Sequence, residues 1–342
     1  IWALGASVLF DIYYNYADKD GNVNYNSSVL ISGSTTQLED PAITSSGNGH
    51  SAIVWEDEAA SDDQIVFTLF KNSLASSKTI STGKNGAPQV IWADNVYAVV
   101  WINYDNDTQN IFMATVDGNG DIKLGPKNIT NHKSTEDAIL PLDIAFNGNS
   151  YGITYQYSDT SDSISSYQTY FIKVAKSTLS SSIGKLIVTP KGGYSSSGAT
   201  ISWSGKVYGI VWDEEPPYSP GGYDSGVRLY FNTFDSDGNA QMNSPVEISK
   251  ELGSGHSGKI AFNGINFGVA FSRNSDIHFL EVTEGGSAGK ILPIAKDGTA
   301  LEAFPSIIST DNPTFGVAWL DNRSGGNFQV YFAVACANVA AN

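Results

Sequence analysis

The stretch that decides the fold is VAWLDNRSGGNFQVYFAVA, residues 317–335. An apolar run ends in an aromatic residue, a polar turn follows, and a second run alternates apolar and polar residues. This pattern is typical of a β-hairpin. The first run recurs along the chain as HSAIVWED, VYAVVWIN, SYGITYQY, VYGIVWDE and NFGVAFSR. Its aromatic residues lie 46 to 59 residues apart, at Trp55, Trp101, Tyr155, Trp212, Phe271 and Trp319.

Each of these runs is preceded by one short apolar segment and followed by one or two more, separated by DG, NG or GN turns. A complete unit is therefore expected to be a four-stranded antiparallel meander. The N-terminus fits the same frame, because ten residues separate Trp2 from Ile12, as they do Trp55 from Ile65. Repeats of about 40–60 residues with four strands each indicate a β-propeller.

We therefore predict an all-β fold, a single β-propeller domain over residues 1–342 made of four-stranded antiparallel blades. Seven blades are favoured, and six are the alternative. The first blade is expected to lack its first strand, and the last blade its fourth. The predicted blade units span approximately residues 1–32, 41–82, 88–130, 141–189, 198–249, 258–295 and 304–336.

The amino-acid composition limits the classes of partner and the cellular location that we expect. Asp and Glu number 35 against 19 Lys and Arg, for a net charge of −16, which argues against nucleic acid as a partner. No apolar run has the length of a membrane span, so no membrane insertion is expected. A single cysteine, high acidity and many Asn, Ser and Tyr residues favour an extracellular or cell-surface location. Four asparagines in Asn-x-Ser/Thr triplets are glycosylation candidates: Asn26, Asn106, Asn128 and Asn322.

The final repeat, FGVAWLDNRSGGNFQVYFA, resembles repeats of secreted or surface-exposed microbial β-propellers with a W-x-D-x-R pattern. The resemblance implies a propeller over nearly the whole chain and no specific functional family. Sialidases fit poorly, because their Ser-x-Asp-x-Gly-x-Thr-Trp box is missing. They also use three arginines around the substrate carboxylate, and this chain has only Arg228, Arg273 and Arg323, at unlike positions in the repeat.

Acidic residues gather in the turns expected on one face of the propeller, where side chains of different blades converge into the default ligand site. Those expected before the first strands of the units are Glu39, Asp40, Glu136, Asp137 and Glu302. Those expected between the second and third strands are Glu56, Asp57, Glu58, Asp105, Asp107, Asp213, Glu214, Glu215 and Asp321.

Three interpretations of this acidity remain open. Oxygen ligands are those that Ca²⁺ prefers, which makes Asp40, Asp57 and Asp137 candidate calcium ligands. A pair of carboxylates could instead hydrolyse a glycoside, and the candidates are Glu39, Glu136 and Glu302. The third interpretation is that most of these residues are solvated turn residues that keep the surface soluble.

Two tyrosines lie in the longest insertion, EEPPYSPGGYDSG, residues 214–226. Exposed aromatic rings beside carboxylates suit sugars, although a plain mobile loop is the other interpretation. The candidate ligand-binding residues are Tyr218, Tyr223, Asp213, Glu214, Asp321 and Arg323. Asp321 and Arg323 are also expected to pair and stiffen their turn, and the repeated tryptophans to pack between blades.

The main functional prediction is an extracellular or cell-surface propeller for binding or adhesion, which recognises a glycan, a polymer or a surface protein through its acidic face. The alternative is a glycoside hydrolase or lyase that uses carboxylates at the channel mouth. A second alternative is a structural repeat domain of a larger envelope or filament assembly, joined to further domains.

Overall fold

A computed structural model describes residues 2–4, 11–16, 28–32, 36–47, 49–59, 62–71, 73–74, 77–105, 108–132, 138–158, 167–182, 184–188, 194–216, 226–296, 302–310, 313–323 and 328–336. The regular structure in these ranges is β, apart from one short 3-10 helix, η3 (Lys250–Leu252). No helix among the described residues is long and apolar enough to cross a membrane.

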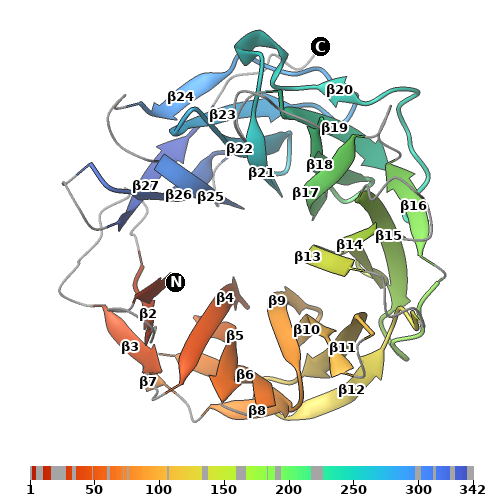
Figure 1. The fold of residues 1–342 in the computed structure, drawn as a ribbon, viewed down its shortest axis with the longest axis vertical. Coiled ribbons are helices and arrows are strands. Elements are labelled where there is room, and N and C mark those ends of the chain that lie inside the picture. Colours follow the sequence, from red (N-terminus) through yellow and green to blue (C-terminus); the bar gives the residue numbers. More distant parts are fainter. Residues whose placement is uncertain are drawn as a thin grey trace. The chain divides into compact units, whose positions relative to one another are not determined.

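The strands form antiparallel sheets whose members follow one another in the chain (Figure 1). The first three sheets are β1 (Trp2–Leu4), β2 (Asp11–Tyr14) and β3 (Val29–Ser32); β4 (Gln37–Ser45), β5 (Ser51–Ala59), β6 (Asp62–Lys71), β7 (Ser73–Leu74) and β8 (Lys78–Ser81); and β9 (Asn85–Ala93), β10 (Val96–Asn103), β11 (Asn110–Val116) and β12 (Ile122–Asn128).

The remaining four sheets follow in the same manner. They are β13 (Ala138–Phe146), β14 (Ser150–Ser158), β15 (Gln168–Ala175) and β16 (Lys185–Val188); β17 (Ser195–Trp203), β18 (Tyr208–Glu215), β19 (Arg228–Phe234) and β20 (Val246–Glu247); β21 (His256–Phe262), β22 (Phe267–Arg273), β23 (Asp276–Val282) and β24 (Leu292–Ala295); and β25 (Glu302–Ser309), β26 (Phe315–Asp321) and β27 (Gln329–Ala335).

Contacts group the chain into two compact units, Ile1–Tyr151 with Lys173–Gly184, and Gly152–Ile172 with Lys185–Asn342. The predicted all-β fold of four-stranded antiparallel meanders is confirmed, and the number of blades stays a prediction. One sheet departs from the expected four strands. The ten-residue β6 pairs with β7 at its end and with β8 nearer its start, so this sheet has five strands.

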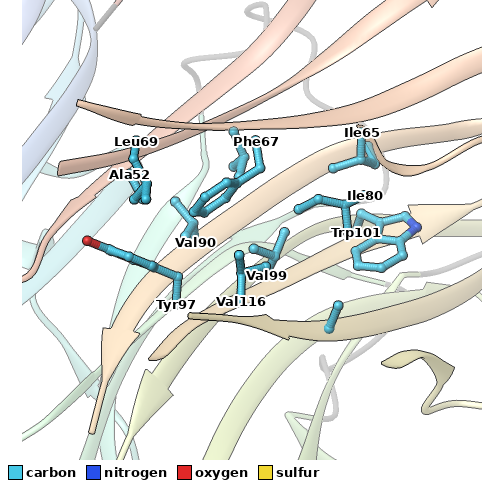
Figure 2. Close-up of a cluster of buried hydrophobic side chains, with 12 residues drawn as sticks. Ala52, Ile65, Phe67, Leu69, Ile80, Val90, Tyr97, Val99, Trp101 and Val116 are labelled. Atoms are coloured by element: carbon cyan, nitrogen blue, oxygen red, sulfur yellow. The ribbon is translucent and has the colours of Figure 1, made fainter. Parts of the chain in front are cut away.

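Side chains of successive sheets interdigitate within each unit. In the first unit, Figure 2 shows Phe67 of β6 and Val90 of β9 beside Tyr97, Val99 and Trp101 of β10. The alternation of side chains along β5 sends Ala52 and Val54 into this cluster. Ile53 and Trp55 on the opposite face pack with Ile12, Ile31 and Leu38. Because both faces of β5 are buried, the strand reads as a nearly continuous apolar run.

The repeated aromatic residues are core residues, as predicted. Trp55, Trp101 and Trp212 are no more than 2% exposed, and Trp319 is 5% exposed. In four sheets the aromatic residue stacks or tilts against a ring directly opposite on the next strand, with ring centroids 5.5–6.1 Å apart. The pairs are Trp101–Phe112, Trp212–Tyr230, Phe271–His278 and Trp319–Tyr331.

A β-bulge lies opposite the repeated aromatic residue in five sheets. Two residues of the sheet's first strand oppose the single aromatic residue, and the first of the two has a positive φ of 46° to 58°. The bulge pairs are Asp40–Pro41, Ala87–Pro88, Gly198–Ala199, Ser257–Gly258 and Phe304–Pro305. Bulges of this kind re-aim nearby side chains and are frequent beside functional sites.

Candidate functional site

Because of the bulges, several acidic residues lie in strands and not in the turns where the sequence predicted them. The residues just before each bulge already belong to the first strand, and they pair with the last residues of the second strand. Acidic residues that were expected in turns therefore lie in strands. The register Gln37↔Glu58, Leu38↔Asp57, Glu39↔Glu56 shows this in the second sheet. In the same way Asp213, Glu214 and Glu215 lie in β18, Glu302 begins β25, and Asp321 ends β26.

Several predicted residues lie outside what the structure describes. They are Asn26, Asn106, Asp107, Glu136, Asp137, Tyr218 and Tyr223, together with the side chain of Glu302. Of the other glycosylation candidates, Asn128 accepts hydrogen bonds from the backbone N–H groups of Thr130 and Asn131. Asn322 directly follows β26.

Polar residues two positions after the repeated aromatic residues serve the framework. The indole N–H of Trp212 donates to Glu214 Oε1 at 3.4 Å, and that of Trp319 to Asp321 Oδ2 at 3.3 Å. These carboxylates give a buried indole N–H the acceptor that it needs. In the second sheet Asp57 holds the equivalent place and accepts a hydrogen bond from the Thr36 hydroxyl.

Arg323 forms the predicted pair with Asp321. Its backbone N–H donates to Oδ1 at 2.7 Å, and its guanidinium Nε donates to Oδ2 at 2.6 Å. The guanidinium also lies 4.5 Å from the ring centre of Tyr331. Burial alone would raise the pKa of Asp321, but the hydrogen bonds from Arg323 and Trp319 outweigh it and hold that pKa below its usual range. The pair fixes the turn that follows β26.

Residues one position after the aromatic residues point the other way, toward the bulge of the following sheet. Asp213 Oδ2 accepts the backbone N–H of Ser257 at 2.8 Å, and Glu56 accepts that of Ala87. Gln156 at the same position donates to the carbonyl of Ser196 at 2.5 Å. The two kinds of acidic position therefore have different surroundings, although they are adjacent in sequence.

Glu56 lies among several carboxyls of the second sheet, and the charges of Asp40, Glu58 and Asp63 act on it. Glu39 lies directly opposite it in β4. Burial, then the charge of Asp40, raises the pKa of Glu56 to about 8, although the hydrogen bond from Ala87 opposes the shift. Glu58 forms a side-chain hydrogen bond with Glu39. Since like charges at short range resist joint ionisation, this group keeps a proton at neutral pH.

Tyr104 completes the group, and no sequence pattern pointed to it. Burial, then the charges of Glu56 and Asp40, raises its pKa to about 12, so it is a neutral hydroxyl at neutral pH. Gly86 leaves room for both side chains, because a Cβ there would lie 2.8 Å from Glu56 Oε2 and 3.2 Å from Tyr104 Cε2. The glycine therefore lets the carboxyl approach the bulge.

The calcium prediction stays a prediction. Across the residues that the structure describes, no three His, Cys, Asp or Glu side chains are placed to hold a metal ion together. Asp40 and Asp57 occupy adjacent strands of the second sheet, and the third candidate, Asp137, is outside the described ranges.

No family model matches the chain, and no curated protein matches it. Solved structures do. An α-L-arabinanase of Penicillium chrysogenum complexed with arabinobiose has 13% identity and a TM-score of 0.59, over 87% of this chain and 93% of that one. A Trypanosoma rangeli sialidase with a difluorosialic acid covalent intermediate has 11% identity and a TM-score of 0.54, over 94% and 56%. A Mycobacterium tuberculosis puromycin-hydrolyzing peptidase also has 11% identity and 0.54, over 87% and 45%.

At these identities the likeness establishes the fold, a β-propeller. It supports the propeller part of the sequence resemblance, and no family evidence supports the W-x-D-x-R repeat group. The main functional prediction, binding or adhesion, is contradicted, because the solved structures compared above are enzymes, an arabinanase, a sialidase and a peptidase.

Proposed function

We propose that the chain is a glycoside hydrolase in which Glu56 is the general acid and Glu39 the second carboxylate. The observation that carries the proposal is the buried position of Glu56, directly opposite Glu39 in the neighbouring strand. Hydrolysis of a glycoside needs one carboxyl that donates a proton and a second that acts as nucleophile or base. Burial beside Asp40 gives Glu56 a pKa of about 8, which suits an acid at neutral pH.

The placement of Glu39 supports its role. Side chains directly opposite each other in an antiparallel pair have Cβ atoms about 4.5–5.5 Å apart and lie on one face of the sheet. Glu39 and Glu56 are such a pair. Retaining enzymes hold their carboxyls about 5–5.5 Å apart, a spacing that two opposite glutamates can adopt.

In the proposed reaction, Glu56 protonates the glycosidic oxygen as the bond from that oxygen to the anomeric carbon breaks. Glu39 forms the new bond to the anomeric carbon. Water then cleaves this ester while Glu56, now ionised, takes the proton from water. The neutral Tyr104 hydroxyl beside Glu56 supplies a hydrogen-bond donor to the sugar.

The first substrates to test are arabinose-containing oligosaccharides, because the arabinanase is the neighbour with the highest similarity score of the three compared. A secreted or surface location, which the composition favours, would give the enzyme access to such polymers. Aryl glycosides of the common pentoses and hexoses widen the search to other sugars.

The test compares the wild-type chain with Glu56→Gln on these substrates. We expect turnover by the wild type and a loss of about 10²-fold or more in kcat for Glu56→Gln, because amides do not donate this proton. Glu281→Gln is the matched control, since Glu281 is also buried but bonds Asn266 at 3.0 Å elsewhere in the fold. Equal activity of Glu56→Gln and Glu281→Gln, or no turnover of any substrate by the wild type, would overturn the proposal.

A further inference from the structure

The three arginines of the chain have unequal surroundings. Arg228 Nε lies 3.3 Å from Glu247 Oε1, and Arg323 is held by Asp321. Arg273 forms no ion pair with the described residues, and its Nε is buried without a hydrogen-bond partner. In a chain with 35 acidic residues against 19 basic ones, an unpaired arginine is conspicuous. A buried donor left without an acceptor is also costly, which makes a missing ligand a natural explanation.

Arg273 stands where other sheets place an acid. It lies two positions after Phe271, as Glu214 follows Trp212 and Asp321 follows Trp319. Those carboxylates accept an indole N–H, whereas a phenylalanine ring donates nothing. The sixth sheet therefore has no framework need for an acid at this position, and it carries a cation instead.

His278 adds a second buried nitrogen without a partner on the same face, although its ring also forms a hydrogen bond with the backbone of Asp276. Its ring stacks on Phe271 at 5.5 Å, and Phe271 and His278 are directly opposite in β22 and β23. His278 is 6% exposed, and its Nδ1 has no hydrogen-bond partner. Burial, with smaller contributions from the positive charges of Arg273 and Lys296, lowers the pKa of His278, while Asp276 opposes the shift.

We propose that Arg273 and His278 form a binding site for an oxyanion, either a carboxylate or a sulfate. A guanidinium group matches the oxygens of such groups with two parallel hydrogen bonds. Asp276 lies directly opposite Arg273. Among the described groups whose charges act on His278, the positive charges of Arg273 and Lys296 oppose the negative charge of Asp276. The site does not include Glu56, so the test of this proposal is independent of the test of the hydrolase activity.

The test titrates the full chain with sodium sulfate and sodium acetate against sodium chloride at constant ionic strength. We expect a saturable rise of the Tm with an oxyanion, absent with chloride. The affinity should fall at least tenfold in Arg273→Gln and remain in Arg228→Gln, which removes the same charge from a paired arginine. A response to acetate alone identifies a carboxylate site, and one to sulfate alone a sulfate site.

A second readout keeps the test decisive if Arg273→Gln does not fold. A bound anion beside the ring favours the imidazolium, so the pKa of His278, followed by NMR, should rise on titration of the wild type. In Arg273→Lys, which keeps the charge but loses the fork, the same rise should need several-fold more anion. No saturable effect of either oxyanion on Tm or on His278, or an equal loss in Arg228→Gln, would refute the site.

Discussion

The backbone N–H of Ser257 donates to Asp213 Oδ2 at 2.8 Å and so ties the end of β18 to the bulge of β21. The bulge permits this contact, because Ser257 has a φ of 56° that turns its N–H out of the usual ladder. The other oxygen of Asp213 has no partner, and the side chain is 3% exposed. One carboxyl therefore links two sheets of the second unit and remains half satisfied.

Asp213→Asn should stabilise the protein at alkaline pH. Burial raises the pKa of Asp213 to about 7 against the hydrogen bond from Ser257. A raised carboxyl pKa means that the folded state holds a proton which the unfolded state releases above pH 4. Stability from this group is then full at low pH and falls as the pH rises toward 7, by about 4 kcal/mol in all. Asparagine keeps the acceptor for Ser257 and removes this loss.

The measurement is urea unfolding of both proteins at pH 5 and pH 8. The gain of Asp213→Asn over wild type should be larger at pH 8 than at pH 5. Asp237→Asn in an exposed turn is the control, and it should show no such difference. A gain that does not depend on pH would contradict the raised pKa.

Asp40→Asn should move the pH dependence of catalysis. After burial, the charge of Asp40 is the largest cause of the raised pKa of Glu56. If Glu56 is the general acid, kcat/KM falls above pH 8 as Glu56 ionises. Without the negative neighbour Glu56 ionises at lower pH, so the alkaline limb should shift toward neutrality. Asp57→Asn, whose carboxylate is bonded by Thr36, is the control that should leave the limb in place.

The repeated aromatic residues made the order of the sheets predictable from the sequence. Each one lies at the end of the apolar run of a strand that is buried on both faces, and a single sequence displays such a run plainly. The pairing of Asp321 with Arg323 was predictable for a similar reason, because two opposite charges two residues apart meet in a turn.

The bulges were not predictable, and the site depends on them. Asp40, Ala87, Ser257 and Phe304 share a positive φ but no side-chain chemistry. Proline follows three of them, Asp40, Ala87 and Phe304, but a proline alone does not identify a bulge. When the bulges are not known, the acidic residues next to them in sequence are interpreted as turn residues. The different hydrogen-bond partners of Glu56 and Asp57 could not be predicted from the sequence either, because they depend on the direction in which each side chain points.

Arg323→Gln should destabilise the protein by about 1–3 kcal/mol, because it leaves the buried Asp321 carboxylate without its main donors. The double variant Asp321→Asn/Arg323→Gln should recover part of this loss, since the buried charge is then gone. Thermal unfolding at pH 7 measures both. In the wild type the lowered pKa of Asp321 adds stability above pH 4, which is lost as the pH falls through the folded-state pKa. A double variant less stable than Arg323→Gln would refute this account.

Gly209→Ala should destabilise the second unit by about 1–3 kcal/mol through overpacking. A Cβ at Gly209 would lie 2.6 Å from the ring of Phe267, the aromatic residue that opens β22 of the next sheet. Gly152 meets Tyr208 and Gly268 meets Phe315 in the same way, which explains why an aromatic-glycine pair recurs near the start of these strands. Gly118→Ala is the control, because Gly118 has a negative φ and open space around its Cβ position. If denaturant unfolding gives both variants the same stability, the glycines do not set the spacing between these sheets.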